Sequence, residues 1–270
     1  MPYEQITVET RGAVCLITLN RPEKLNAWTP DMSRELGQAI TAANEDDAIG
    51  TIVMTGAGRG FCAGADMSYF QSNIDASETK AHKRDGGIDW ISLIRSSKPC
   101  IAAVNGPAFG IGVTQILPFD MIVASTAAKF GLVFVKVGIV PELASSHFLV
   151  QRVGWGTAHD LLLTARPVSG EEAVSIRLAD RLSDPETLLD DALELAEQIA
   201  ANPSPMLRMT KELLSANACD TDTARIQARE HEKLETCFTL PEHTEAVAAF
   251  AEKRKPDFNA ARHKAQARID

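Results

Sequence analysis

Two patterns of apolar residues alternate along this chain. Short, nearly unbroken apolar runs at residues 14–19, 51–55 and 100–104 are typical of strands that are buried on both faces of a sheet. Met32, Leu36 and Ile40 instead recur every four residues, and this spacing predicts a helix with one face toward the core. Strands that alternate with helices favour an α/β core with a largely parallel sheet.

The two ends of the chain depart from this alternation. Residues 6–9 and 14–19 predict two strands joined by a hairpin turn at Arg11-Gly12. From Pro185 onward the pattern is almost entirely helical, with helical segments at residues 188–199, 206–214, 223–238 and 242–253. We therefore expect an α/β core over residues 1–200 and a helical region over residues 201–270.

A glycine-bearing turn follows the apolar run at residues 100–104. Asn105-Gly106-Pro107 ends the run, Gly110 and Gly112 come next, and residues 113–117 predict a helix. A strand, a glycine turn and a helix start gather free backbone N–H groups at one point, which can bind a phosphate, a carboxylate or a developing oxyanion. The alternative is that the two glycines only allow a helix and a strand to pack closely, and the pattern leaves both interpretations open.

A second glycine-rich loop, at residues 56–66, follows the run at residues 51–55. Its glycines do not have the G-x-G-x-x-G spacing of a dinucleotide site, and no Gly-Lys-Ser/Thr sequence closes a Walker A loop. The sequence therefore gives two glycine loops, each after a strand, without a nucleotide-binding motif.

Composition narrows the function classes further. The chain has 270 residues and a formal net charge of −9, which argues against broad binding of nucleic acids or anionic membranes. Its five cysteines are scattered and form no C-x-x-C pair, so zinc and thioredoxin chemistry are not expected. Scattered cysteines and the lack of a signal-like N-terminus lead us to expect a cytoplasmic protein.

Several motifs together resemble the crotonase superfamily, the enoyl-CoA hydratase/isomerase family, over essentially the whole chain. They are FCAGAD at residues 61–66, NGPAFGIG at 105–112, LNRP at 19–22 with LNA at 25–27, and FAEKRKP at 250–256. The resemblance implies a crotonase (ClpP-like) spiral of β-β-α units with a C-terminal helical trimerisation region. It also implies a trimer or a dimer of trimers that binds acyl-CoA substrates. No separate cofactor is expected, since coenzyme A is part of the substrate.

The resemblance also assigns roles within the site. The backbone N–H groups of Ala65 and Ile111 would stabilise a thioester enolate. Coenzyme A would lie along two segments, with contacts at Lys24, Leu25, Ala27, Ala63, Ala65, Asp66 and Met67. Lys24, Lys253 and Lys255 are candidates for its phosphates, although each could equally be a solvated surface charge. Asp66 could order the oxyanion loop or cap the helix that begins there.

The acid–base residues decide which reaction such a fold performs. By resemblance, the two glutamates of the family's hydratases correspond here to Thr114 and Phe134. A threonine hydroxyl is too weak an acid or base near neutral pH, and phenylalanine has no proton to exchange. Glu142 instead falls where the family's Δ3,Δ2-enoyl-CoA isomerases have their catalytic acid. Its apolar neighbours predict a raised pKa, which suits a base that removes an α-proton; the alternative is a helix N-terminal glutamate.

The sequence therefore favours an enoyl-CoA isomerase that shifts a Δ3 double bond to Δ2, with Glu142 as its base. An enoyl-CoA hydratase, another crotonase reaction such as thioester hydrolysis or decarboxylation, and a non-catalytic acyl-CoA-binding protein are the alternatives. A hydrolase based on residues 145–147 is not expected, since no G-x-S-x-G elbow is present. Cys62 is expected to be a small packing residue, and residues 68–87 are expected to shape the acyl pocket.

Overall fold

The computed structural model describes residues 3–69, 71 and 88–261. Its larger sheet has six strands in the order β1-β2-β3-β4-β6-β9. β1 (Ile6–Arg11) and β2 (Val14–Leu19) form the expected antiparallel hairpin. The other strands, which all pair in parallel, are β3 (Thr51–Gly56), β4 (Cys100–Val104), β6 (Met121–Ser125) and β9 (Arg181–Ser183).

A smaller, three-stranded sheet lies beside the first, in the order β5-β7-β8. Its strands are β5 (Pro107–Phe109), β7 (Lys129–Gly131) and β8 (Val168–Ser169). β5 follows β4 and β7 follows β6, so successive turns of the chain each add one strand to each sheet. This arrangement confirms the expected spiral of β-β-α units, and an isolated bridge between Cys62 and Ala108 continues it by one further turn.

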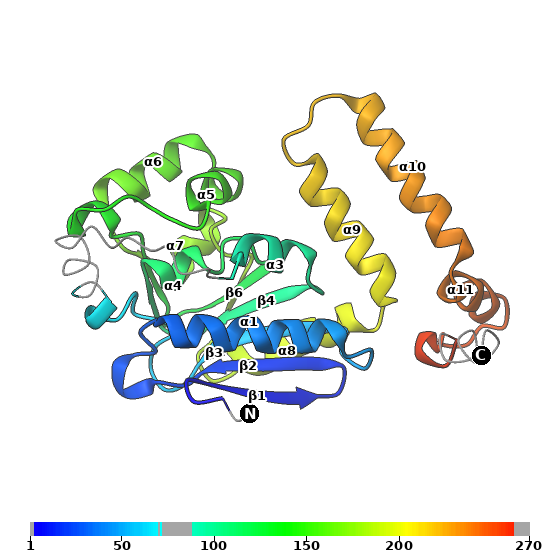
Figure 1. The fold of residues 1–270 in the computed structure, drawn as a ribbon, viewed down its shortest axis with the longest axis horizontal. Coiled ribbons are helices and arrows are strands. Elements are labelled where there is room, and N and C mark those ends of the chain that lie inside the picture. Colours follow the sequence, from blue (N-terminus) through cyan, green and yellow to red (C-terminus); the bar gives the residue numbers. More distant parts are fainter. Residues whose placement is uncertain (1–2, 70, 72–87, 262–270) are drawn as a thin grey trace.

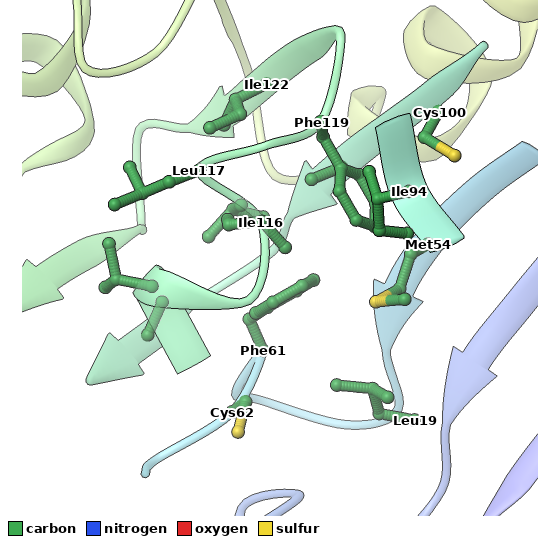
Figure 2. Packing of buried hydrophobic residues seen from close by; sticks show 14 of the residues in the cluster. Leu19, Met54, Phe61, Cys62, Ile94, Cys100, Ile116, Leu117, Phe119 and Ile122 are labelled. Carbon is green, nitrogen blue, oxygen red and sulfur yellow. The ribbon is translucent and has the colours of Figure 1, made fainter. Parts of the chain in front are cut away.

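Two amphipathic helices cover the larger sheet (Figure 1). In α1 (Pro30–Glu45), the Thr29 hydroxyl accepts the Met32 N–H, and the predicted stripe of Met32, Leu36 and Ile40 is buried. α8 (Leu188–Ala200) contacts β3 and β4 with a second apolar face. The core beneath the glycine loops is continuous with that under α1: Figure 2 shows the Phe61 ring pointing into the same cluster as Met54 and Ile116.

Short helices connect the strands. The helix expected at residues 113–117 is a single turn, α4, which begins at Ile111 and ends at Thr114. The predicted helix began too late in the chain, because Gly112 lies inside this turn and not before it. Other connecting helices in the described part of the chain are η1 (Pro22–Lys24), α3 (Trp90–Ser96), η2 (Phe134–Val137), α5 (Ser145–Val153), α6 (Trp155–Thr164) and α7 (Gly170–Ser175).

The long helices after residue 203, within the described residues, are α9 (Ser204–Asn217), α10 (Thr223–Thr239) and α11 (Pro241–Ala251). α9 contacts α3, whereas α10 and α11 extend away from the sheets (Figure 1). Phe238, Val247 and Phe250 are exposed on these outer helices. The helical character expected of this region is confirmed, while its proposed role in association stays a prediction. No helix in the described part of the chain is both long and apolar enough to cross a bilayer.

Candidate active site

The two glycine loops are hydrogen-bonded to each other at the carboxyl ends of β3 and β4. The Phe61 and Cys62 N–H groups both donate to the Pro107 carbonyl at 3.1 Å, and the Phe109 N–H donates to the Cys62 carbonyl at 2.9 Å. A Cβ on Gly112 would lie 2.2 Å from the Cys62 carbonyl oxygen. The close-packing interpretation is therefore correct for Gly112, which allows the two backbones to approach each other.

A glycine with positive φ directly precedes each proposed oxyanion donor. Gly64 has φ 110° and comes before Ala65, and Gly110 has φ 52° and comes before Ile111. The loops are adjacent here, since a Cβ on Gly64 would lie 3.3 Å from the Phe109 carbonyl oxygen. Within the described part of the chain, neither the Ala65 N–H nor the Ile111 N–H donates a hydrogen bond. Two backbone donors are thus left on neighbouring loops, as an oxyanion hole requires.

Glu142 lies in the loop between η2 and α5 and is largely shielded from solvent. The Thr114 hydroxyl donates a hydrogen bond of 2.6 Å to Glu142 Oε1. Glu142 Oε2 is buried and has no hydrogen-bond partner among the described residues. Burial raises the pKa of Glu142, and the hydrogen bond from Thr114 opposes this shift in part. A carboxylate in this setting is a stronger base than one in water.

The carboxylate of Glu142 does not act as a helix cap. α5 begins three residues later, at Ser145, and the side chain bonds to Thr114 on α4 instead. Leu143 and Ala144, between Glu142 and Ser145, have φ values of 54° and 52°. This conformation costs a non-glycine residue about 1–2 kcal/mol. The alternative interpretation of Glu142 as a helix N-terminal charge is therefore wrong, and the strained loop turns its carboxylate toward α4.

Arg21 links the loop at residues 21–28 to the glycine loop at residues 56–66. Its guanidinium donates to the Ala27 carbonyl at 2.6 Å and to Asp66 Oδ2 at 3.0 Å. Asp66 Oδ1 also accepts the Ser68 N–H and hydroxyl, and together these interactions lower the pKa of Asp66 to about 2. Both interpretations of Asp66 are thus correct, because it caps the following turn and orders the loop.

Asn26 fastens the same two loops from within. It is fully buried, and its amide donates to the carbonyls of Ala57 and Gly60. The Ala63 N–H donates to the Leu25 carbonyl at 3.0 Å. Arg21 and Asn26 belong to the LNRP and LNA motifs, and the sequence alone assigned neither side chain a role. Because polar residues lie near both ends of this short loop, hydrogen bonds across the loop could have been predicted.

A family model described as enoyl-CoA hydratase/isomerase matches residues 9–261. The chain belongs to the enoyl-CoA hydratase/isomerase family. It is 38% identical to a Rhizobium meliloti protein named "Probable enoyl-CoA hydratase" over 96% of this chain and 99% of that one. It is 33% identical to the 1,2-epoxyphenylacetyl-CoA isomerase of Escherichia coli, over 94% of this chain and 98% of that one. A crystal structure of an enoyl-CoA hydratase from Polaromonas superposes with a TM-score of 0.86 at 30% identity, covering 93% of this chain and 98% of that one.

The positions that are predicted, by resemblance, to correspond to the glutamates of the family's hydratases contain no carboxylate here. Thr114 is completely buried, and Phe134 is part of the hydrophobic core at the start of η2. Neither side chain can transfer a proton to or from water. Glu142 is instead a carboxylate that is hydrogen-bonded to the α4 turn, through Thr114.

The lysines expected to bind the phosphates of coenzyme A are not gathered in one place. Lys24 is exposed on η1, beside the bonded loops. Lys253 and Lys255 are exposed beyond the end of α11, the helix that lies away from both sheets (Figure 1). Within a single chain, Lys253 is therefore not brought to the site, and the sequence could not show this because it depends on where the outer helices point. Met67 is 77% exposed and borders the loop that contains Ala65.

Cys62 and His147 are not placed to act as a nucleophile or a base at the glycine loops. Burial raises the pKa of Cys62 to about 11, so its thiol is protonated at neutral pH and unsuited to be a nucleophile. His147 lines a pocket with Arg152 and Lys211 beside Asp120, which precedes β6 and so lies at the opposite end of the parallel strands from the glycine loops. Of the segment expected to shape the acyl pocket, residues 70 and 72–87 lie outside the described residues.

Proposed function

We propose that this family member is a Δ3,Δ2-enoyl-CoA isomerase with Glu142 as its single acid–base residue. The observation that carries the proposal is the position of this carboxylate. It is half-buried with Oε2 shielded from solvent, hydrogen-bonded through Oε1 to α4, and joined by that helical turn to the Ile111 N–H. One carboxylate next to an oxyanion hole is what a proton shuttle requires.

The reaction proceeds in two proton transfers. A 3-enoyl-CoA binds with its thioester oxygen at the N–H groups of Ala65 and Ile111. Glu142 removes a proton from C2, and the electron pair of that C–H bond delocalises into a dienolate whose charge lies largely on the thioester oxygen. The protonated Glu142 then returns the proton to C4, and the double bond is left between C2 and C3. No water is consumed and no co-reactant is needed.

Hydration makes a different demand on the site, because a water molecule must be activated and added across the double bond. Relatives named hydratases keep this alternative open. Thr114 and Phe134 argue against it, since neither can activate water, and Glu142 has only one oxygen without a hydrogen-bond partner in the described part of the chain. A binding-only protein is the alternative of another class, and the retained Glu142 argues against it.

Replacement of Glu142 by glutamine tests the assignment. The amide can still accept a hydrogen bond from Thr114 but cannot take up a proton at neutral pH. We expect Glu142→Gln to fold and to bind coenzyme A as the wild type does, while turnover of a 3-enoyl-CoA falls roughly 10²–10⁴-fold. Glu186→Gln, at an exposed position in a turn, is the matched control and should leave turnover unchanged. Unchanged turnover in Glu142→Gln would refute the assignment.

We also propose that the protein is a homo-oligomer, a trimer or a dimer of trimers. The exposed apolar side chains of α10 and α11 support this, because Phe238, Val247 and Phe250 would be buried against another subunit. In such an assembly Lys253 could reach the coenzyme A of a neighbouring subunit. Sedimentation of the wild type and of Phe238→Glu tests the proposal: loss of the assembly is expected in the variant, and a monomeric wild type would refute it.

A further inference from the structure

Thr114 has a second part in the site besides occupying a hydratase glutamate position. Its hydroxyl has a single hydrogen to donate, and it donates that hydrogen to Glu142 Oε1. We propose that Thr114 is a positioning residue that fixes Oε1 of Glu142, so that Oε2 alone removes and returns the proton. The inference rests on the proposed isomerase function, and it names the atom on which that function depends.

Burial makes this hydrogen bond strong enough to fix the carboxylate. Thr114 is completely buried, and the bond of 2.6 Å has the length of a charge-assisted hydrogen bond from a hydroxyl to a carboxylate, which is about twice as strong as one between neutral groups. Oε2 has no donor within the described part of the chain, so it is the more basic of the two oxygens and the one free to accept a proton. The two oxygens of Glu142 therefore differ in role before any substrate binds.

The backbone on both sides of the pair restricts its movement. The Thr114 N–H donates to the Gly110 carbonyl at 3.1 Å, so the hydroxyl belongs to the same helical turn as the Ile111 donor. Threonine is β-branched, and few χ1 rotamers are open to it. On the other side, Leu143 and Ala144 are held at positive φ next to Glu142. The carboxylate that transfers the proton and the N–H group that binds the oxyanion are thus both held in place by the same rigid turn, α4.

The hydrogen bond between Thr114 and Glu142 is not overlaid by the effects of nearby charges on the described residues. Burial and the Thr114 hydrogen bond are the influences on the pKa of Glu142 in the described part of the chain, and no charged side chain of α4, η2 or α5 is among them. A change of the hydroxyl should therefore appear directly in the titration of the carboxylate. Loss of a donor to the charged form disfavours that form, so the pKa of Glu142 should rise when Thr114 becomes valine.

The experiment compares Thr114→Val and Thr114→Ser with the wild type. In Thr114→Val we expect kcat to fall 10–100-fold with KM nearly unchanged, and the acid limb of the pH profile to move to higher pH. Thr114→Ser keeps the hydroxyl and should recover kcat to within about 3-fold of the wild type. Thr55→Val is the matched control, because the buried Thr55 hydroxyl donates to the Ala103 carbonyl instead. It should leave kcat and the pH profile unchanged.

A second readout separates this proposal from the isomerase assignment. Carbon-13 NMR of the glutamate carboxyls, assigned with Glu142→Gln, gives the pKa of Glu142 without any turnover. An upward shift in Thr114→Val supports the positioning role even if 3-enoyl-CoA is not a substrate, in which case the isomerase assignment alone fails. Wild-type kcat together with an unshifted Glu142 pKa in Thr114→Val would overturn the proposal.

Discussion

The Cys62 carbonyl oxygen occupies the space that a side chain at position 112 would need, 2.2 Å from an ideal Cβ on Gly112. This contact sets how closely the loops that bear Ala65 and Ile111 can approach each other. Because the obstacle is backbone, a methyl group at position 112 must push the loops apart.

Gly112→Ala is therefore expected to lower kcat about 10²-fold or more by misplacing an oxyanion donor, and to cost about 1–3 kcal/mol of unfolding free energy. Steady-state kinetics and urea unfolding measure the two effects. Gly156→Ala is the control, because nothing lies within 4 Å of a Cβ there; it should leave kcat unchanged and should not lower the free energy of unfolding, since alanine is the better helix former within α6. A folded Gly112→Ala variant with wild-type kcat would show that the loops need not be locked together.

The strained residue Ala144 predicts opposite effects on stability and activity. Ala144 is exposed and has φ 52°, a conformation that glycine adopts without strain. Ala144→Gly should raise the free energy of unfolding by about 1 kcal/mol. It should also lower kcat, because it loosens the loop that orients Glu142. Ala228→Gly, at an exposed position inside α10, should instead lose about 1 kcal/mol, and equal losses in both variants would contradict the account.

The hydrogen bonds that Asp66 accepts from Ser68 and Arg21 give a pH-dependent prediction. The pKa of Asp66 falls from 3.8 to about 2 on folding, so its contribution to stability is complete above about pH 5. It is lost as the pH falls from about 4 through about 2. Asp66→Asn should therefore be about 1 kcal/mol less stable than the wild type at pH 6, and the difference should shrink at pH 3.

Urea unfolding of both proteins at the two pH values tests this prediction. Glu9→Gln removes an ion pair whose side chains are 52% and 44% exposed, and it should change little at either pH. A stability difference for Asp66→Asn that is as large at pH 3 as at pH 6 would contradict the assignment of the shift to the folded state.

Lys211 fastens α9 to the amino-terminal end of the parallel strands. Its ammonium is buried and lies 2.7 Å from Asp120, which in turn accepts the Cys100 N–H. Lys211→Met should cost about 2–3 kcal/mol, less than a fully buried pair, because Asp120 is partly open to solvent. Lys233→Met breaks the exposed pair with Glu212 and should cost under about 0.5 kcal/mol by the same thermal or urea unfolding measurement. Equal costs would contradict the anchoring role.

The larger sheet and its helices could be predicted because their patterns are periodic and local. The stripe of Met32, Leu36 and Ile40 and the apolar run at residues 100–104 both matched buried faces. β5, β8 and β9 were missed, since strands of two or three residues carry no periodic signal. Their positions depend on pairing between segments that are distant in sequence.

At the site, the chemistry of single residues could be predicted and their geometry could not. That a threonine at position 114 is a poor acid or base follows from its residue type, whereas its hydrogen bond to Glu142 spans 28 residues and depends on the whole spiral. The positive φ of Leu143 and Ala144 was unexpected because neither residue type favours it. The distance between Lys253 and η1 follows from the direction of α10 and α11, which no sequence pattern sets.

The central claim is that Glu142 moves a proton from C2 to C4 and does not activate water. A paired assay of the wild type with 3-hexenoyl-CoA and 2-hexenoyl-CoA tests it most directly, because conjugation of the first and hydration of the second change the thioester absorbance in opposite directions. The account predicts rapid conjugation of 3-hexenoyl-CoA with little hydration of 2-hexenoyl-CoA. Rapid hydration of 2-hexenoyl-CoA without conjugation of the 3-enoyl substrate would contradict it.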